Sequence, residues 1–538
     1  MKHLFILFIF LVQKGESIYS QIAGELDLSF GLSGITLTDF SPNPEDLYST
    51  DNPYDIGLQS DGKIIASGTA LTDSGRVFAI SRYFPTGELD GDFGIEGKIK
   101  LKFGASVSSS NTMFIQSDDK IILAGGAAAT DTSLYDFGLI RLNANGNIDS
   151  TFGLNGIVLT EMNEKTDEIC ALDILDDNSI VAVGYKHEGI FDDSDFAICK
   201  YSYNGLLDTT FGNGGKLIID LGNSEKASSI IANSDGSLLI GGYSYYDYYE
   251  DGEYYHISEL VLLRLLSSGK IDSTFGINGF TITPVFDYRA YLQKMYEVED
   301  GKYICAVKLV KDFSADFGIV KFDSLGFLDS TFSEDGIVNT DIPYDEFEIV
   351  NDIVIQADNK ILMVGYTDAS ADNAADVVVV RYLQEGVLDS TFQYDGISII
   401  DINELYNQGN AMCLQPDGKI IVAADASDGE GGSDFAIIRL WGDSGISASS
   451  ENYFDNNLTI YPNPTANTFH LVNKLQQLQS NTYAINLYST TGFLCLQREI
   501  MDNQPVDITQ LPSGIYTLKI TDEFNNITNK KLIKIAEK

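Results

Sequence analysis

The sequence predicts an all-β chain: a seven-bladed β-propeller with four strands per blade, followed by a small C-terminal β-sandwich. The first observation is a signature of Gly, two residues, Asp, two residues, Phe and, four residues later, Gly, which occurs seven times. The second is its period, because successive signature aspartates lie 57 to 64 residues apart. A fixed period of this size requires each unit to bury its apolar face against the next. The signature aspartates are Asp27, Asp90, Asp149, Asp208, Asp272, Asp329 and Asp389.

Each repeat contains four short apolar runs that have the pattern of β-strands. In the last repeat they span 396–401, 411–415, 419–424 and 434–440, and Gly, Asp, Asn or Pro bounds each run. An Asp-Gly-Lys turn, or a variant with Asn or Asp, precedes the third run in every copy, which predicts a tight hairpin with positive φ. Many short strands favour a closed ring, whose sheet edges are short and protected. An open solenoid is the alternative, and it would need atypical capping repeats.

The signature residues have the chemistry of blade architecture. The spacing from Asp27 to Phe30 suits a carboxylate that accepts backbone N–H bonds across a turn while the ring points inward. The flanking glycines fit positions of positive φ or close approach. A basic residue recurs near the end of the fourth run, and with the signature Asp it would form one ion pair per blade. These basic residues are Arg82, Arg141, Lys200, Arg264, Lys321, Arg381 and Arg439. Because seven copies share both sets, we expect them to be structural and not a unique active site.

The pattern GxLDxxFGxxG, followed by QxDGKIIxxG and DFxxxR, resembles the delta-60 repeat, a bacterial β-propeller-type repeat of this period. The resemblance covers residues 24–441 and all seven copies. It departs at Ser333 and Gln393, where the Gly after Phe is lost, and at Val307 and Ala424, where the Gly that ends the third run is lost. These departures are expected to weaken individual turns without changing the fold. The resemblance implies a propeller and no established activity.

The first 20 residues have the layout of a secretory signal peptide. The basic residue Lys2 precedes the apolar run 4–12, and small residues follow. No Cys lies near the expected cleavage site, which argues against a lipid anchor. No other stretch approaches the length of a membrane-spanning helix, so none is expected in the mature chain. We assign residues 1–20 to a signal peptide, 21–441 to the propeller, and the small, polar stretch 442–457 to a linker.

Residues 458–538 form a second unit with a different plan. Alternating apolar runs at 483–488, 515–520 and 531–535 predict strands, and the length suits a small β-sandwich. The ordered motifs YPNP, INLYSTTG and VDITQLPSGIYTLKI, with a Lys-rich terminal strand, resemble the type A C-terminal sorting domain of the type IX secretion system. The matching positions are Tyr461, Pro462, Asn463, Pro464, Gly492, Leu511, Pro512, Gly514 and Tyr516.

This second resemblance implies a secreted protein, or one displayed on the outer cell surface, with the type IX secretion machinery as a partner. In that family the domain directs periplasmic cargo across the outer membrane of Bacteroidetes-type bacteria and is often removed. An independent carbohydrate- or partner-binding sandwich is the alternative interpretation of the segment.

The chain is strongly acidic, with a formal net charge of −44 that falls almost wholly before the C-terminal segment. Such a surface repels phosphate backbones, so nucleic acid is not expected as a partner. Solubility outside the cell explains the acidity, and binding of divalent cations is the alternative. Under that alternative, the acid-rich loops 191–195 and 369–376 would hold calcium. Neither loop has the ligand spacing of a dedicated calcium loop. No other cofactor is predicted. The five cysteines form no Cys-x-x-Cys or Cys/His cluster and are typical of small buried residues.

One loop breaks the repeat, at residues 243–256 between the third and fourth runs of the fourth unit. Seven tyrosines lie there among acids, and loops on rigid scaffolds often carry function. Tyrosine rings stack on sugars or anchor protein partners at low entropic cost, whereas packing of the loop over the ring is the alternative. The candidate ligand-binding residues are Tyr245, Tyr246, Tyr248, Tyr249, Tyr254 and Tyr255.

The sequence contains no catalytic motif that sets a reaction class. Its four histidines are scattered, and no metalloprotease, nucleophile-elbow or phosphate-loop pattern occurs. The leading hypothesis is an exported propeller that acts as a binding or adhesion module for a glycan or a cell-surface protein. A hydrolase or lyase that acts on polysaccharide with propeller-face carboxylates is one alternative, and a structural surface component is the other.

Overall fold

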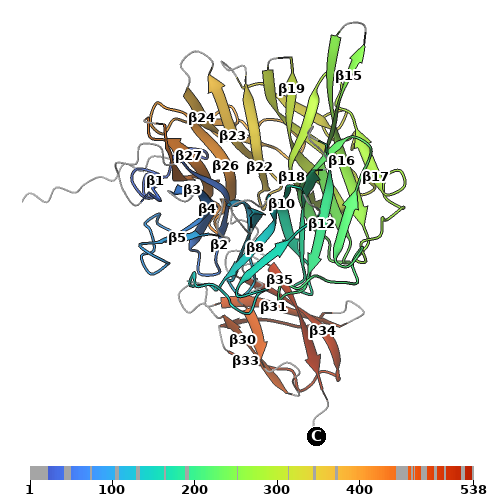
Figure 1. Cartoon of the computed structure of the whole chain (residues 1–538). Coiled ribbons are helices and arrows are strands. Elements are labelled where there is room, and N and C mark those ends of the chain that lie inside the picture. The colour runs from blue at the N-terminus through green and yellow to red at the C-terminus, as the bar shows by residue number, and fades with distance from the viewer. Residues whose placement is uncertain are drawn as a thin grey trace, which may run out of the picture.

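The computed structural model consists of antiparallel β-sheets from the N-terminal repeats to the C-terminal segment (Figure 1). The described residues are 22–41, 50–72, 75–102, 108–128, 134–162, 165–187, 193–250, 253–312, 314–342, 347–369, 374–429, 431–443, 458–461, 465, 467–473, 482–489, 494–501, 504–522 and 527–535. The predicted signal peptide and nearly all of the predicted linker lie outside these ranges. No helix within them is long and apolar enough to cross a membrane.

Seven four-stranded sheets follow one another along the chain as the blades of a propeller. The first three blades contain β2 (Asp51–Leu58), β3 (Ile64–Thr72), β4 (Gly75–Tyr83) and β5 (Lys98–Leu101); β6 (Ser108–Ile115), β7 (Ile121–Ala127), β8 (Asp136–Leu142) and β9 (Ile157–Thr160); and β10 (Asp167–Ile174), β11 (Ile180–His187), β12 (Ser194–Tyr201) and β13 (Lys216–Ile219). The next three contain β14 (Ser224–Ala232), β15 (Leu238–Glu250), β16 (Glu253–Leu265) and β17 (Phe280–Thr283); β18 (Arg289–Val298), β19 (Lys302–Lys311), β20 (Ser314–Phe322) and β21 (Ile337–Thr340); and β22 (Glu348–Ile355), β23 (Ile361–Ala369), β24 (Ala374–Tyr382) and β25 (Ile397–Ile400). The seventh contains β26 (Asn407–Leu414), β27 (Ile420–Ser427), β28 (Ser433–Leu440) and β1 (Ile35–Thr38). A short 3₁₀ turn, η1 (Glu299–Gly301), joins β18 to β19.

Pairing between the two ends of the repeat region closes the ring. β1 is the outer strand of the seventh blade, where Ile35 lies opposite Ile438 and Thr38 lies opposite Phe435. The sequence placed the run after each signature at the start of a repeat, but the structure makes that run the outer strand of the preceding blade. The number of blades and of strands per blade is as predicted, and the repeat boundary is shifted by one strand. A closed ring replaces the open solenoid that the sequence left as an alternative.

The apolar core lies between neighbouring blades. Residues 64–70 of β3 are buried without interruption, which is typical of a strand covered on both faces. Each buried cluster combines two adjacent sheets, as where Phe137 and Leu139 of the second blade pack with Ile180 and Ala197 of the third. Each large apolar side chain removed from water contributes ~1.5–3 kcal/mol, so repeated contact between blades drives ring closure.

The signature residues connect each blade to the next. Phe30 is fully buried, and a Cβ on Gly87 of the following signature would lie only 3.0 Å from the Phe30 ring. At the position after the signature Phe, which is Gly in five copies, Ser333 and Gln393 keep the left-handed conformation with φ of 48°. The turn is therefore retained where Gly is lost, with a strained backbone in its place.

The C-terminal segment forms two further antiparallel sheets around a core of their own, in keeping with the predicted small sandwich. The sheets contain β29 (Leu458–Tyr461), β30 (Thr468–Asn473) and β33 (Pro505–Asp507), and β31 (Thr482–Ser489), β32 (Leu494–Met501), β34 (Gly514–Asp522) and β35 (Ile527–Lys534). Phe469 and Val506 of the first sheet pack with Ile485 and Leu518 of the second.

Candidate functional site

The blade ends form two faces with different chemistry. The turns between first and second strands, such as 59–63, and the signature turns, such as 84–97, lie at one end, which we call the signature face. The connections between second and third strands, and those between blades, lie at the opposite end, which we call the loop face. The tyrosine-rich stretch 243–256 belongs to the loop face.

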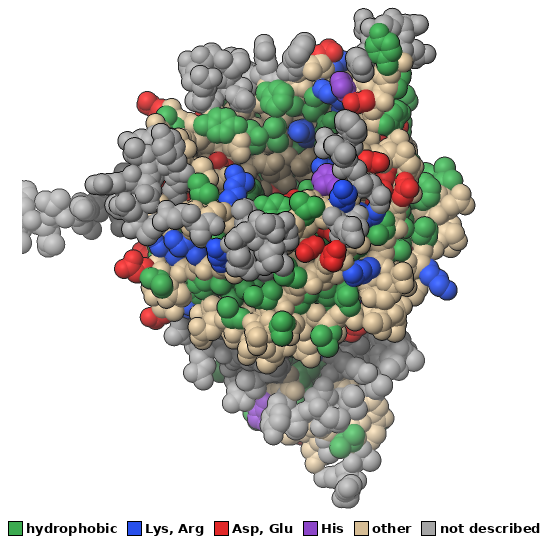
Figure 2. Space-filling model, in the orientation of Figure 1, with side chains coloured by type: hydrophobic (Ala, Val, Ile, Leu, Met, Phe, Trp, Pro, Cys, Tyr) green, Lys and Arg blue, Asp and Glu red, His purple; other side chains and the backbone are tan. Residues whose placement is uncertain are grey.

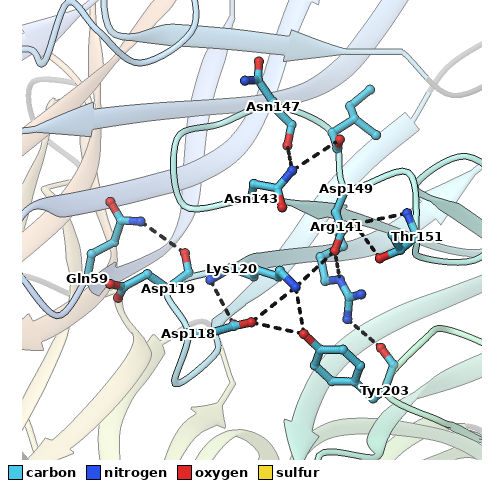
Figure 3. A network of polar contacts seen from close by, with 11 residues as sticks. Gln59, Asp118, Asp119, Lys120, Arg141, Asn143, Asn147, Asp149, Thr151 and Tyr203 are labelled. Atoms are coloured by element: carbon cyan, nitrogen blue, oxygen red, sulfur yellow. Dashed lines mark hydrogen bonds and ion pairs between the residues drawn. The ribbon is translucent and has the colours of Figure 1, made fainter.

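Ion pairs on the signature face serve the architecture, as the second and third blades show (Figure 3). Asp149 accepts a hydrogen bond at 2.9 Å from the Nε of Arg141, and Arg141 also donates to the carbonyl of Tyr203 in the next blade. The other oxygen of Asp149 accepts the N–H and hydroxyl of Thr151, which closes the turn. Burial opposes the charged carboxylate, but Thr151 and the Arg141 charge outweigh it and hold the pKa of Asp149 at about 2.

The same arrangement recurs around the ring, which confirms the predicted pairing in most blades. The other pairs are Arg82 with Asp90, Lys200 with Asp208, Arg264 with Asp272, Arg381 with Asp389 and Arg439 with Asp27. The fifth blade differs from the prediction, because Lys302 contacts Asp329 at 2.8 Å while Lys321 lies over the ring of Phe332. An ion pair to the signature Asp therefore occurs in each blade, from the predicted basic residue in six of them and from Lys302 in the fifth, which makes the signature face a scaffold.

The first strand of each blade carries one β-bulge at the same register, and these strands pack against one another around the centre of the ring. A bulge turns one extra side chain out of the ladder, so seven bulges direct seven side chains toward the centre. The bulge residues are Tyr54, Asn111, Cys170, Ser228, Gln293, Asn351 and Asn410, and all of them line one cavity. None of these seven positions was predicted from the sequence to belong to a site.

Four bulge residues also fasten their blade to the next. Each donates a side-chain hydrogen bond to a backbone carbonyl of the following first strand, at 2.6 to 2.9 Å. The donors and accepting residues are Asn111 to Ile169, Ser228 to Leu292, Asn351 to Gly409, and Asn410 to Pro53. The last of these joins the seventh blade to the first, so the bulges both close the ring and shape the central cavity.

The cavity has a volume of about 600 Å³ and opens along the axis of the ring. In the part of the chain that the structure describes, five tyrosines line it: Tyr54, Tyr185, Tyr243, Tyr291 and Tyr366. Tyr243 and Tyr291, from adjacent blades, meet edge to face with ring centroids 5.0 Å apart. Figure 2 shows the hollow between the blades, with hydrophobic and basic side chains around its edge.

Lysines alternate with these tyrosines. The Nζ of Lys226 lies 4.5 Å from the ring centroid of Tyr185, and that of Lys308 lies 4.9 Å from the ring centroid of Tyr291. Burial and the neighbouring Arg289 lower the pKa of Lys308. Lys294 is different, because the charge of Asp352, 3.6 Å away, outweighs burial and raises the pKa of the lysine.

Carboxylates of the first strands are engaged by the protein itself. Asp55 accepts the backbone N–H of Met113 at 2.7 Å, and Asp173 accepts that of Ala232 at 2.8 Å, each across a blade boundary. Burial raises the pKa of both carboxyls. Burial also raises the pKa of Asp425 to about 6, beside the amide of Asn410.

The predicted tyrosine loop is a β-hairpin and not a loop. β15 and β16 stay paired out to Glu250 opposite Glu253, so alternate tyrosines point to opposite faces. On one face Tyr246, Tyr248 and Tyr255 form a stacked row, with 4.9 Å between the centroids of the last two.

The other face of the hairpin continues from the cavity. Tyr245 lies 6.4 Å from the cavity residue Tyr243, between ring centroids, and Tyr249 is 62% exposed further along the same strand. On this face Asp247 contacts His256 at 2.6 Å. The side chain of Tyr254 lies outside the described residues. The candidate tyrosines are thus divided between two surfaces, of which one is continuous with the cavity.

The acid-rich loops predicted to hold calcium lie partly outside the described residues. Asp195, at the end of the first loop, pairs with Lys186 at 2.9 Å. Acidic triads do occur between blades on the loop face, where the three carboxylates lie within 4.8 Å of one another. They are Asp39, Asp51 and Asp434; Asp195, Asp220 and Glu225; and Asp316, Asp341 and Glu348. Calcium binding remains a prediction.

The sorting-motif positions lie partly in the described residues. Leu511 packs against the core of the segment, and the hydroxyl of Tyr516 donates to the carbonyl of Pro512 at 2.7 Å. Tyr461 ends β29 and Gly514 begins β34. Pro462, Asn463, Pro464 and Gly492 lie outside the described residues.

Known protein families match both the repeat region and the C-terminal segment. Residues 459–535 match a family described as the secretion system C-terminal sorting domain. Residues 59–93, 116–152, 233–275, 356–392 and 415–444 match a β-propeller domain of unknown function, DUF5122. The protein is therefore an exported β-propeller. It carries DUF5122-type repeats and a type IX sorting domain, and that domain indicates a secreted or cell-surface location.

Other comparisons add no function. No curated protein matches the chain. A mannose phosphorylase from Leishmania mexicana, in complex with phosphate ion, is 12% identical over 57% of this chain and 88% of its own, with a TM-score of 0.27. The PQQ-bound aldose sugar dehydrogenase from Streptomyces coelicolor is 11% identical over 76% of this chain and 98% of its own, with a TM-score of 0.34. Likeness at this level carries no argument about activity.

Proposed function

We propose that the propeller is a binding module that acts outside the cell and takes a glycan in its central cavity. The observation that carries the proposal is the wall of five tyrosines around a space of about 600 Å³, which is the size of a small-ligand site. A tyrosine offers an apolar ring to the C–H faces of a sugar and a hydroxyl to its oxygens, and it loses little entropy on binding.

The tyrosine hairpin adds a second surface beside the cavity. Because Tyr243 lines the cavity and Tyr245 and Tyr249 follow on the same face of β15, an extended ligand can leave the cavity along the hairpin. A chain-like glycan fits this geometry better than a compact small molecule. This proposal keeps the predicted adhesion role and moves the main site from the hairpin into the ring.

The test is retention of the full chain on a glycan array, with and without two sets of substitutions. Tyr243→Ala with Tyr291→Ala should lower retention at least ~10-fold, because each ring contributes ~1 kcal/mol or more of stacking. Tyr245→Ala with Tyr249→Ala should weaken long glycans more than short ones. Tyr394→Ala is the matched control, since Tyr394 is 74% exposed on the signature face.

Two results would refute the proposal. One is equal retention of the cavity variant and the wild-type chain. The other is capture of a cell-surface protein, with no glycan bound, through the signature face.

A further inference from the structure

The lining of the cavity has a charge opposite to that of the protein. The whole chain carries −44, yet among the described residues the charged side chains that line the cavity are three lysines, Lys226, Lys294 and Lys308, and two aspartates, Asp55 and Asp352. A protein so rich in carboxylates has abundant acids with which to neutralise a lysine. Cations gathered at this tyrosine-lined cavity therefore call for an explanation beyond solubility.

Two of the lysines lack an acidic partner within the described residues. No carboxylate oxygen there lies within 4.0 Å of the ammonium of Lys226 or Lys308. The nearby Glu168 accepts the hydroxyl of Tyr185 at 2.6 Å. Both lysines are half-buried, so their charges are partly removed from water without an ion pair in return. Lys294 is not part of this pair, because Asp352 already faces it.

The two lysines alternate with tyrosines around one side of the cavity. Lys226 of β14 pairs in register with Tyr243 of β15, and Tyr291 of β18 pairs with Lys308 of β19. Since the rings of Tyr243 and Tyr291 touch, the order along the wall is Tyr185, Lys226, Tyr243, Tyr291, Lys308. Aromatic surface in the middle with an ammonium on each side suits a chain of sugar rings that carry anionic groups.

We infer that the ligand of the cavity is an acidic saccharide. Its pyranose faces lie on Tyr243 and Tyr291, and its carboxylates or sulfates accept hydrogen bonds from the ammonium groups of Lys226 and Lys308. This inference rests on the proposed function and adds the ligand class. A neutral glycan would leave both lysines without an anion, so it should bind more weakly.

The experiment compares ligands that differ only in charge. An oligogalacturonate and its fully methyl-esterified form are titrated calorimetrically into the full chain, in EDTA so that calcium cannot bridge carboxylates. A sulfated galactan oligosaccharide and its desulfated form make the second pair. We expect the acidic member of at least one pair to bind ~10-fold more tightly, with an affinity that falls as salt is added. The pair that responds distinguishes a carboxylate ligand from a sulfate ligand.

Charge substitutions assign the effect to the two lysines. Lys226→Gln and Lys308→Gln should each remove most of the preference for the acidic ligand over its neutral form. Lys270→Gln is the matched control, because Lys270 is exposed on the signature face and changes the net charge equally. Fluorescence of the only tryptophan, Trp441, checks that each variant is folded.

Equal affinity for charged and neutral members of both pairs would overturn the inference while leaving the glycan proposal intact. A preference that survives in both lysine variants would also overturn it. If no saccharide of either kind is retained, the proposed function itself fails.

Discussion

Replacing the signature carboxylate of the second blade tests whether the ion pairs hold the propeller together. Asp149→Asn keeps the side-chain shape and the hydrogen bonds of the turn but removes the charge opposite Arg141, which is fully buried. The pKa of about 2, against an ordinary 3.8, corresponds to ~2 kcal/mol of stabilisation at neutral pH. Because the guanidinium is left buried without its carboxylate, we expect the free energy of unfolding to fall by ~3 kcal/mol in total.

The third blade provides the comparison. There Lys200 lies 3.5 Å from Asp208, whose side chain is 26% exposed, so Asp208→Asn should cost only ~1 kcal/mol. Urea unfolding of the full chain, followed by Trp441 fluorescence and by circular dichroism, measures both variants. Adding Arg141→Met to Asp149→Asn should recover part of the loss, since it removes the unpaired charge. Equal midpoints for the two single variants would refute the reasoning.

Three further predictions follow from the same structure. The pKa of Asp149 is depressed in the folded state, so its contribution to stability is present above pH ~4 and is lost as the pH falls toward about 2. The raised pKa of Asp425, about 6, has the opposite effect, because its contribution to stability decreases as the pH rises from ~4 to 6. A pH series of urea midpoints should therefore fall steeply below pH ~4, and a flat series would count against the ion pairs. Gly184→Ala should destabilise the fold by several kcal/mol, because its Cβ would lie 1.8 Å from a backbone oxygen, whereas Gly91→Ala, with nothing within 4 Å, should leave the thermal midpoint unchanged. Deletion of residues 458–538 should trap the protein inside the outer membrane, as measured by fractionation, and unchanged release would show that the segment is not required for export.

The repeat made the architecture predictable from sequence. Residues equivalent to Asp149 and Phe152 occur in every copy, because each blade needs the same turn and the same inter-blade contact. A local pattern therefore predicted the architecture of the whole ring. The shift of one strand at the repeat boundary was not predictable in this way. A periodic sequence has no marked origin, and only the pairing of β1 with β28 sets one.

The central cavity could not be assembled from sequence, because its residues come from all seven blades. Tyr185, Tyr243 and Tyr366 nonetheless share a local signal, since each directly follows the last Gly of the QxDGKIIxxG pattern. The bulge residues, such as Asn410, carry no such signal. A bulge depends on the register between two strands and not on the residue that occupies it.

The tyrosine-rich stretch was identified by composition, and its conformation was predicted incorrectly. Two strands of 13 residues replace the expected loop. Tyrosine favours the pleated surface of a strand, so the density of tyrosines that suggested a binding loop also extends the hairpin. Cross-strand pairs such as Tyr248 with Tyr255 supply the packing that holds it.

Hydrogen exchange of the full chain, with and without a bound acidic oligosaccharide, tests the central claim most directly. If the cavity on the ring axis is the binding site, protection should increase in the inner segments of β14, β15, β18 and β19, where Lys226, Tyr243, Tyr291 and Lys308 lie. Signature turns such as 143–156 should exchange at the same rate in both states. Protection confined to the signature face, or to the C-terminal segment, would contradict the account.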